Sequence, residues 1–330
     1  MKKAVIKILS AVCSLGIALS LFSCEKTTAE TETSAELYYT VSFNTEGGSP
    51  VESMKIQEGK TIHRPDDPVR DNYVFCRWIY NEVEWVFHET TVKQDMTLNA
   101  YWIEADKFFE IEPTADSGEL YILGIRRQES LDSLKVPSII NGKTVVAIFD
   151  NAFENIHDAH TQHLILPESI TSIGSEAFKN ISKGKITING TITQLGEGAF
   201  ERCSTLTEIK LGKGIEIIPF TAFSDCVSIE HMDIPDGVTK IDENAFAGCS
   251  SLRTVILPET LTSIENSAFD DCKALKTVFF KGTPEQFDNI AIDELNDDII
   301  DATVYFYSEQ QPAEEGNFWH YDKNNSPVIW

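Results

Sequence analysis

The chain has 330 residues, and its 52 acidic side chains outnumber its 27 basic ones, which gives a formal net charge of −25 at pH 7. A chain this acidic repels nucleic acid and anionic lipid, so neither is expected as a direct partner. The length accommodates one small domain and one larger domain.

Residues 1–23 have the pattern of a secretory signal. Three lysines precede an apolar stretch from Ile8 to Phe22, which is shorter than the roughly 20 residues that a membrane-spanning helix needs. The stretch ends in Leu-Phe-Ser-Cys, and this end resembles the lipobox of bacterial lipoproteins. The resemblance implies export, acylation of Cys24 and a lipid anchor in the cell envelope. Ordinary cleavage that leaves Cys24 unmodified stays open as the alternative.

A tether and a small domain are predicted next. Residues 24–37 are rich in Thr and Glu and have no apolar period, which indicates a solvated tether. Residues 38–103 contain short alternating runs separated by Gly and Pro, which predicts β-strands. Their motifs are Val41-Ser-Phe-Asn, Gly47-Gly48, Pro65 and Pro68, Tyr73-Val-Phe, Trp78 and Leu98-Asn-Ala-Tyr-Trp102. This set resembles the internalin-type B repeat, also called the Listeria–Bacteroides repeat, and implies a separate β-grasp-like module that serves as a stalk.

An Ala-Phe pair that recurs every 22 to 25 residues dominates the rest of the chain; its phenylalanines are Phe153, Phe178, Phe200, Phe223, Phe246 and Phe269. A fixed period of this size indicates stacked units, each too small to bury its own apolar face. Three residues after the last four phenylalanines come Cys203, Cys226, Cys249 and Cys272. We expect a buried phenylalanine spine and free thiols, because an Ile occupies the cysteine position in the earlier units.

The unit P-x-x-[VIL]-x-x-I-x-x-x-A-F-x-x-C-x-x-L resembles the BspA-like leucine-rich repeat of bacterial surface proteins. The resemblance implies a mainly β chain with a solenoid of about six units of 22–25 residues over 134–278. It also implies a lead-in or N-terminal cap over 104–133 and a C-terminal cap over 279–330. Such solenoids are displayed outside the cytoplasm and are assigned to adhesion or host contact. The aromatic residues of the tail are interpreted as part of the cap, with a sugar-binding platform as the alternative.

Each unit also contains a short strand whose alternate side chains point away from the core. These outward positions vary from unit to unit, as expected of a surface that recognises a protein or a glycan. A merely solvated face is the alternative. The candidate ligand-binding residues are His163, Ile165, Lys185, Thr187, Glu208, Lys210, His231, Asp233, Thr254, Ile256, Thr277 and Phe279.

The sequence offers little catalytic chemistry. It lacks the common nucleophile, zinc-protease, P-loop and dinucleotide motifs, so no enzyme activity and no cofactor are expected. His157, His160 and His163 are spaced three apart, and a solvated loop is favoured over a metal site there because no cysteine accompanies them. The leading hypothesis is a surface lipoprotein that binds an extracellular protein or glycan. Its rival is a structural or assembly lipoprotein of the envelope without an external ligand.

Overall fold

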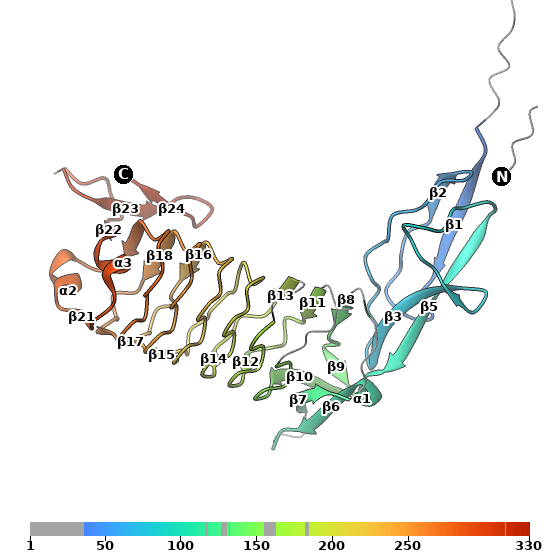
Figure 1. The fold of residues 1–330 in the computed structure, drawn as a ribbon, viewed down its shortest axis with the longest axis horizontal. Helices are drawn as coiled ribbons and strands as arrows, with labels where there is room; N and C mark the ends of the chain where they lie inside the picture. The colour runs from blue at the N-terminus through green and yellow to red at the C-terminus, as the bar shows by residue number, and fades with distance from the viewer. Residues whose placement is uncertain are drawn as a thin grey trace, which may run out of the picture. The chain divides into compact units, whose positions relative to one another are not determined.

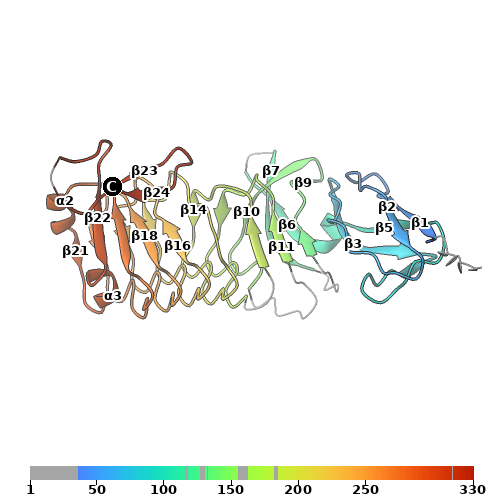
Figure 2. The same cartoon turned by 90° about the horizontal axis from the view of Figure 1, so that it is seen from above.

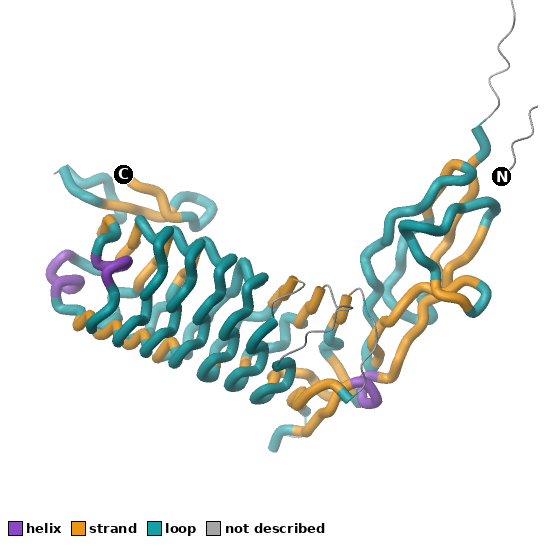
Figure 3. Tube along the Cα trace, in the orientation of Figure 1, coloured by secondary structure: helices purple, strands orange, loops and turns teal. Residues whose placement is uncertain are grey.

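The computed structural model describes residues 36–330 apart from 116–117, 127–130, 132, 155–162, 182–184 and 314. Cys24, His157 and His160 therefore lie outside the described residues, as do the signal and nearly all of the tether. Residues 38–330 form one compact unit. The described part is almost entirely strands and turns, as Figure 3 shows. The predicted mainly β fold with a solenoid is thus confirmed.

The small domain is a five-stranded mixed sheet. Its central pair is parallel, and the other neighbours are antiparallel. The order is β2-β1-β5-β3-β4, which matches the β-grasp-like arrangement expected from the sequence. Val41, Trp78 and Leu98 are fully buried on one face, because alternate residues of each strand point to the same side. The strands are β1 (Tyr38–Asn44), β2 (Met54–Gln57), β3 (Tyr73–Tyr80), β4 (Val83–Glu84) and β5 (Met96–Glu104).

The small domain is not a separate module, since strand β3 contributes to two cores. Phe75 and Trp78 belong to the small domain's own core, whereas Val74 and Cys76 are buried in the core of the solenoid. Strand β5 continues directly into helix α1 (Ala105–Phe108), and Phe108 is buried in that same solenoid core. The apolar Cys76 is explained by this position, because a polar side chain there would be desolvated without a partner. The small domain therefore closes the first end of the solenoid.

The solenoid coils present two ladders of short strands, one along the upper side and one along the lower side of the solenoid in Figure 1. Most pairs are parallel, as expected when equivalent strands of successive coils stack. One ladder contains β8 (Ser133–Lys135), β11 (His163–Leu166), β13 (Lys185–Ile188), β16 (His231–Asp233), β18 (Thr254–Leu257), β20 (Thr277–Phe280) and β22 (Thr303–Tyr307). The other contains β6 (Phe109–Pro113), β7 (Glu119–Ile125), β9 (Ile139–Ile140), β10 (Lys143–Ile148), β12 (Ser172–Ile173), β14 (Gln194–Leu195), β15 (Ile217–Ile218), β17 (Lys240–Ile241), β19 (Ser263–Ile264) and β21 (Ala291–Ile292).

Both ladders are interrupted near the coil that contains Glu208 and Lys210. In the first, β8, β11 and β13 form one sheet and β16 begins another; in the second, β14 ends one sheet and β15 begins another. Leu211 instead forms an isolated parallel bridge with Ile192. The preceding coil is one residue shorter, because eight residues separate Phe178 from Ile186 whereas nine separate Phe200 from Ile209.

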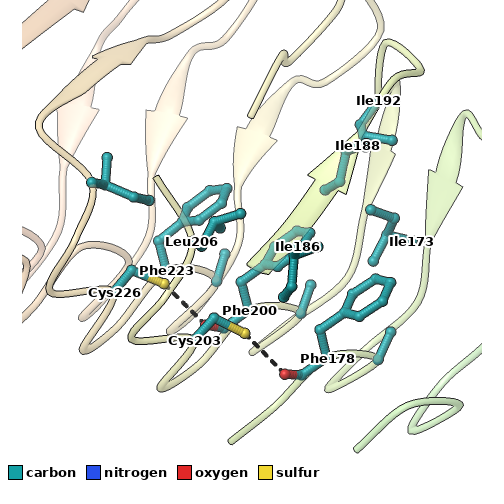
Figure 4. Close-up of a cluster of buried hydrophobic side chains, with 14 of the residues drawn as sticks. Ile173, Phe178, Ile186, Ile188, Ile192, Phe200, Cys203, Leu206, Phe223 and Cys226 are labelled. Carbon is teal, nitrogen blue, oxygen red and sulfur yellow. Dashed lines mark hydrogen bonds between the residues drawn. The ribbon is translucent and has the colours of Figure 1, made fainter. Parts of the chain in front are cut away.

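The Ala-Phe turns form a third, uninterrupted ladder. The backbone N–H of Phe200 donates to the carbonyl of Ala222 at 2.9 Å, and that of Phe223 donates to Ala245 at 2.8 Å. The rings of the six phenylalanines are stacked, with neighbouring centroids 5.2 to 5.6 Å apart. Each of these rings is fully buried, and Figure 4 shows three of them in line. The predicted phenylalanine spine is confirmed.

The cysteines beside the spine are free and buried, as predicted. Each thiol donates a hydrogen bond to a phenylalanine carbonyl of the preceding coil, as from Cys203 to Phe178 at 2.9 Å and from Cys226 to Phe200 at 3.1 Å (Figure 4). Burial raises the pKa of Cys203 to about 12 and that of Cys249 to about 12. The thiols therefore stay protonated and act as weak donors that link successive coils.

The second end of the solenoid is closed by the segment after β20. The N–H of Phe269 has no following coil to pair with, and it donates instead to Oδ1 of Asn296 at 3.0 Å. Asn296 is fully buried and donates its own amide to the Glu265 carbonyl at 2.9 Å. One side chain thus substitutes for a missing coil. The short helices of this cap are α2 (Pro284–Asp288), which a Thr283 capping box begins, and α3 (Asp297–Ile300).

Candidate ligand-binding surface

The outward side of strands β8, β11, β13, β16, β18, β20 and β22 is called the strand face here. Parallel register brings its side chains into rows across neighbouring coils. His163 lies beside Lys185, and Ile165 beside Thr187. Likewise, Asp233 lies beside Ile256, which lies beside Phe279. Ten of the twelve predicted residues lie on these strands, and the two on the interrupted coil, Glu208 and Lys210, are exposed outside them.

The open half is the part of the strand face on β8, β11 and β13. Lys185 is exposed there, while His163, Ile165 and Thr187 are half-buried. Nε2 of His163 lies 2.8 Å from the Thr187 hydroxyl. Partial burial lowers the pKa of His163, and the charges of Lys185 and Lys135 lower it further. The ring is therefore largely uncharged at neutral pH and offers hydrogen bonding rather than charge.

The covered half is the part of the strand face on β18, β20 and β22. A hairpin made of β23 (Phe318–Tyr321) and β24 (Pro327–Ile329) lies across it, visible at the red end of Figure 1 and again in Figure 2. Trp319 is fully buried, and its ring centroid lies 5.1 Å from that of Phe279. Its indole N–H donates to the Phe280 carbonyl at 3.0 Å, so the polar end of the side chain is satisfied as well.

The expectation that Ile256 and Phe279 face solvent is wrong. Only 8% of Ile256 and 6% of Phe279 is exposed, because Trp319 packs on both of them. The physical reason is that apolar side chains on an outward row gain from being covered, and the aromatic tail supplies the cover. Thr254 and Thr277 beside them are half-buried, whereas His231 and Asp233 at the margin stay exposed. The tail thus serves as a cover for the strand face as well as an end cap.

Lys281 forms two ion pairs beside the hairpin of β23 and β24, and these are called the ionic clamp. Nζ of Lys281 lies 3.3 Å from Oδ1 of Asp233 and 3.1 Å from Oδ1 of Asp236. Burial by itself lowers the pKa of Lys281, but the carboxylate of Asp233, the hydroxyl of Tyr321 and the carboxylate of Asp236 outweigh burial, and the net shift is upward. Lys281 therefore stays charged and links the end of β20 to the end of β16, two strands away, and to the hairpin.

The described part of the chain contains neither a group of metal ligands nor a helix long and apolar enough to span a membrane. No group of three His, Cys, Asp or Glu side chains there is arranged to hold a metal ion. His163 is occupied by its contact with Thr187, and the other two histidines of the predicted cluster fall outside the description. The helices α1, α2 and α3 have four or five residues each, and none reaches the length and hydropathy of a membrane span.

The coil geometry agrees with comparisons to known protein families. The BspA type leucine-rich repeat region matches residues 127–219 and 171–296, in six copies. The chain belongs to the BspA type leucine-rich repeat family. This is a family of cell-surface repeat proteins, whose members are typically non-enzymatic. The Listeria–Bacteroides repeat domain matches residues 39–101, the small domain that closes the first end of this BspA-type solenoid.

Relatives of the BspA-type chain resemble parts of it. Two proteins of Evansella cellulosilytica, provisionally named as membrane proteins, are 37% and 39% identical to it over 67 residues, or 19% of the chain. The match spans only 10% and 8% of the length of these two proteins.

Solved structures of other proteins are similar to part of this chain. A leucine-rich cell surface protein of Faecalibacterium prausnitzii is 27% identical, with a TM-score of 0.39, over 56% of this chain and 41% of that one. A leucine-rich repeat protein of T. pallidum is 26% identical, with a TM-score of 0.45, over 53% of this chain and 83% of that one.

Sequence reasoning missed the cover over the strand face. A signal was present, because the last two coils carry Ile256 and Phe279 at outward positions where earlier coils carry Thr187, Lys210 and Asp233. Two large apolar side chains in consecutive outward positions indicate a buried row. The aromatic run at β23 was assigned to the cap region, and its contact with these two residues depends on how the chain turns back after β22.

Proposed function

We propose that this BspA-type chain is an exported surface lipoprotein, anchored through Cys24, that binds an extracellular protein or glycan. The open half of the strand face is its binding surface. The observation that supports this is the contrast along the strand face: the hairpin covers Ile256 and Phe279, whereas Lys185 is exposed. A rigid surface with differing polar side chains suits selective recognition.

The test uses the mature chain, residues 24–330, against a panel of purified extracellular matrix proteins and immobilised glycans. For any partner found, the Lys185→Glu and Thr187→Arg variants should lose binding, because they reverse a charge and add bulk on the open half. The matched control is Lys273→Glu, an exposed lysine paired with Asp271 on the turn side of the solenoid. Loss of binding in the control and not in the two variants would show that the binding surface lies outside the open half.

The competing function is a structural or assembly role in the envelope without an external ligand. Protease treatment of intact cells separates the two. Cleavage of the solenoid on intact cells supports surface display, and complete protection until the cells are lysed favours the structural role. The anchor is tested separately by Cys24→Ala, which should move the protein from the detergent phase to the aqueous phase in detergent partitioning. Unchanged partitioning would refute acylation at this residue.

A further inference from the structure

A groove of about 500 Å³ lies where the small domain meets the ends of strands β8, β11 and β13. One wall comes from the Gly47-Gly48 turn and the segment from Pro68 to Tyr73, and the other from residues just past the three strands. This volume falls within the roughly 300–1,000 Å³ of small-molecule sites in proteins. The groove adjoins the open half, because Lys135 and Ile165 belong to both.

The wall from the small domain is tightly built around Arg70. Its guanidinium carbon lies 3.9 Å from the ring centroid of Tyr73 and 6.0 Å from that of Trp102. Trp102 is fixed in turn, since its indole N–H donates to the Thr45 carbonyl at 3.0 Å. A Cβ at position 48 would lie 2.6 Å from Cζ2 of Trp102, so the turn requires glycine there. The Listeria–Bacteroides repeat motifs thus orient one arginine along the groove.

The charge of the groove is opposite to that of the chain. Arg70 and Lys135 line it against a single acid, Asp71, although acids outnumber bases about two to one in the whole sequence. Arg70 has no carboxylate within ion-pair distance among the described residues. Lys135 donates to the backbone carbonyl of Asp67, which leaves its charge unbalanced by a carboxylate at that contact. Neither cation forms an ion pair with a carboxylate among the described residues. Both line one groove, where their positive charge would attract an anion.

The remaining lining fits a hydroxyl-rich ligand better than a peptide. Ser138 and Asn189 offer a hydroxyl and an amide, and Pro137 and Ile165 provide an apolar floor. The groove crosses the carboxyl ends of three paired strands and does not run along any one of them. A peptide consequently cannot add itself as a further strand, the usual way in which a sheet binds an extended chain.

We infer that this groove binds a saccharide that bears a carboxylate, with Arg70 and Lys135 pairing with the carboxylate. The inference rests on the proposed binding function and narrows its ligand class. A guanidinium can hold a carboxylate through two parallel hydrogen bonds, and stacking on Tyr73 leaves its edge free to do so. The sugar ring would lie on the apolar floor with its hydroxyls toward Ser138 and Asn189.

Calorimetric titration of residues 24–330 with two acidic probes tests the inference: trigalacturonate, a uronic-acid source, and sialyllactose, a sialic-acid source. Binding of either probe, with maltotriose giving none, supports it and identifies the source of the carboxylate. Arg70→Gln should then weaken binding roughly 10- to 100-fold, the range for a charge-assisted hydrogen-bonded pair. Arg70→Lys should recover only part of this loss, because an ammonium lacks the two-pronged geometry.

The matched control is Arg253→Gln, which removes an exposed arginine that pairs with Glu230 far along the sequence, and it should leave binding unchanged. Triglutamate that binds as tightly as trigalacturonate would overturn the saccharide class, as would equal losses in the Arg70 and Arg253 variants. Failure of both acidic saccharides to bind would overturn the inference itself. A partner from the extracellular panel that still depends on Lys185 would then leave the proposed function intact.

Discussion

The two halves of the strand face are built on the same type of coil, but the hairpin of β23 and β24 covers only one of them. Beneath both lie the same stacked phenylalanines and the same Ala-Phe hydrogen bonds. Above β11 and β13 the outward residues are polar or half-buried, whereas above β18 and β20 they are Ile256 and Phe279 under Trp319. The difference teaches that the repeat determines the scaffold and the non-repeated tail determines which part of the scaffold is available.

The largest expected effect comes from breaking the scaffold under the covered half. Phe246 is stacked between Phe223 and Phe269 at centroid distances of 5.3 and 5.2 Å. Phe246→Ala should cost about 3–5 kcal/mol of unfolding free energy, because it leaves a cavity in a close-packed spine. Hydrogen exchange should rise from about residue 223 to 270 and stay unchanged in β11 and β13, since coils interact only with their neighbours. An equal rise in both halves would mean that the solenoid opens as one cooperative unit.

The next effect tests the cover itself. Trp319→Ala removes the side chain that seals Ile256 and Phe279, with an upper limit of about 3–5 kcal/mol for a buried tryptophan. Exchange should rise in β18, β20, β23 and β24, and binding of a hydrophobic dye should increase because two apolar residues become exposed. The matched change in the open half, Ile165→Ala, should produce neither result, because Ile165 is only half-buried. Unaltered exchange in β18 and β20 would show that the hairpin does not protect this half.

A smaller effect concerns the clamp beside the hairpin. Lys281→Met should lower the unfolding free energy by about 0.5–1 kcal/mol at about pH 8, since the side chain is 19% exposed but its two carboxylate partners are about half exposed. The pKa of Lys281 in the fold is raised above 10.5, so its contribution is complete below that pH and is lost as pH rises through the folded value. The difference in unfolding free energy between Lys281→Met and the unsubstituted protein should therefore narrow when urea titrations are repeated at pH values above the folded pKa.

The control for the clamp is Lys273→Met, whose ion pair with Asp271 is largely exposed. This variant should change the unfolding free energy by close to zero at either pH. A Lys281→Met penalty that persisted unchanged at high pH would assign the effect to packing of the side chain stem instead of its charge.

The smallest effect addresses the turn side that both halves share. The residue before each Ala-Phe pair has a left-handed backbone; φ is +57° at Asn244, +58° at Gly198 and +50° at Thr221. A β-branched residue is strained in this region, whereas asparagine tolerates it. Thr221→Asn should therefore raise the unfolding free energy by about 0.5–1 kcal/mol in urea titration. Thr207→Asn, at an exposed position outside the left-handed region, should give no gain.

The fold could be predicted from the sequence because the same apolar pattern recurs in every unit of the repeat. The Ala-Phe period was sufficient to predict the solenoid and the buried spine, and the Ile residues at the cysteine position of earlier units predicted the free thiols. It did not reveal that the thiols donate to phenylalanine carbonyls, since a donor and an apolar side chain are equally compatible with a buried position. Nor did it reveal the interruption of the strand ladder at the coil that contains Glu208.

The candidate surface was predicted only in part, and for a definite reason. Outward positions follow from strand alternation, so the rows containing His163, Lys185 and Thr187 could be located from the sequence. Whether an outward residue meets solvent depends on contacts between segments far apart in the chain, such as Trp319 with Ile256. These contacts depend on chain direction after β22, for which no repeat pattern exists.

The sequence by itself determined the local structure of this protein: strands from alternation and coils from a fixed period. Each of these depends on interactions within one unit or between adjacent units, and the same interactions recur in every unit. Only the tertiary structure decided that Cys76 joins the core of the solenoid, that Asn296 ends the Ala-Phe ladder, and that Trp319 closes half of the strand face. Each of those three contacts is made once, between segments without a common period, and burial there depends on where the folded chain brings them together.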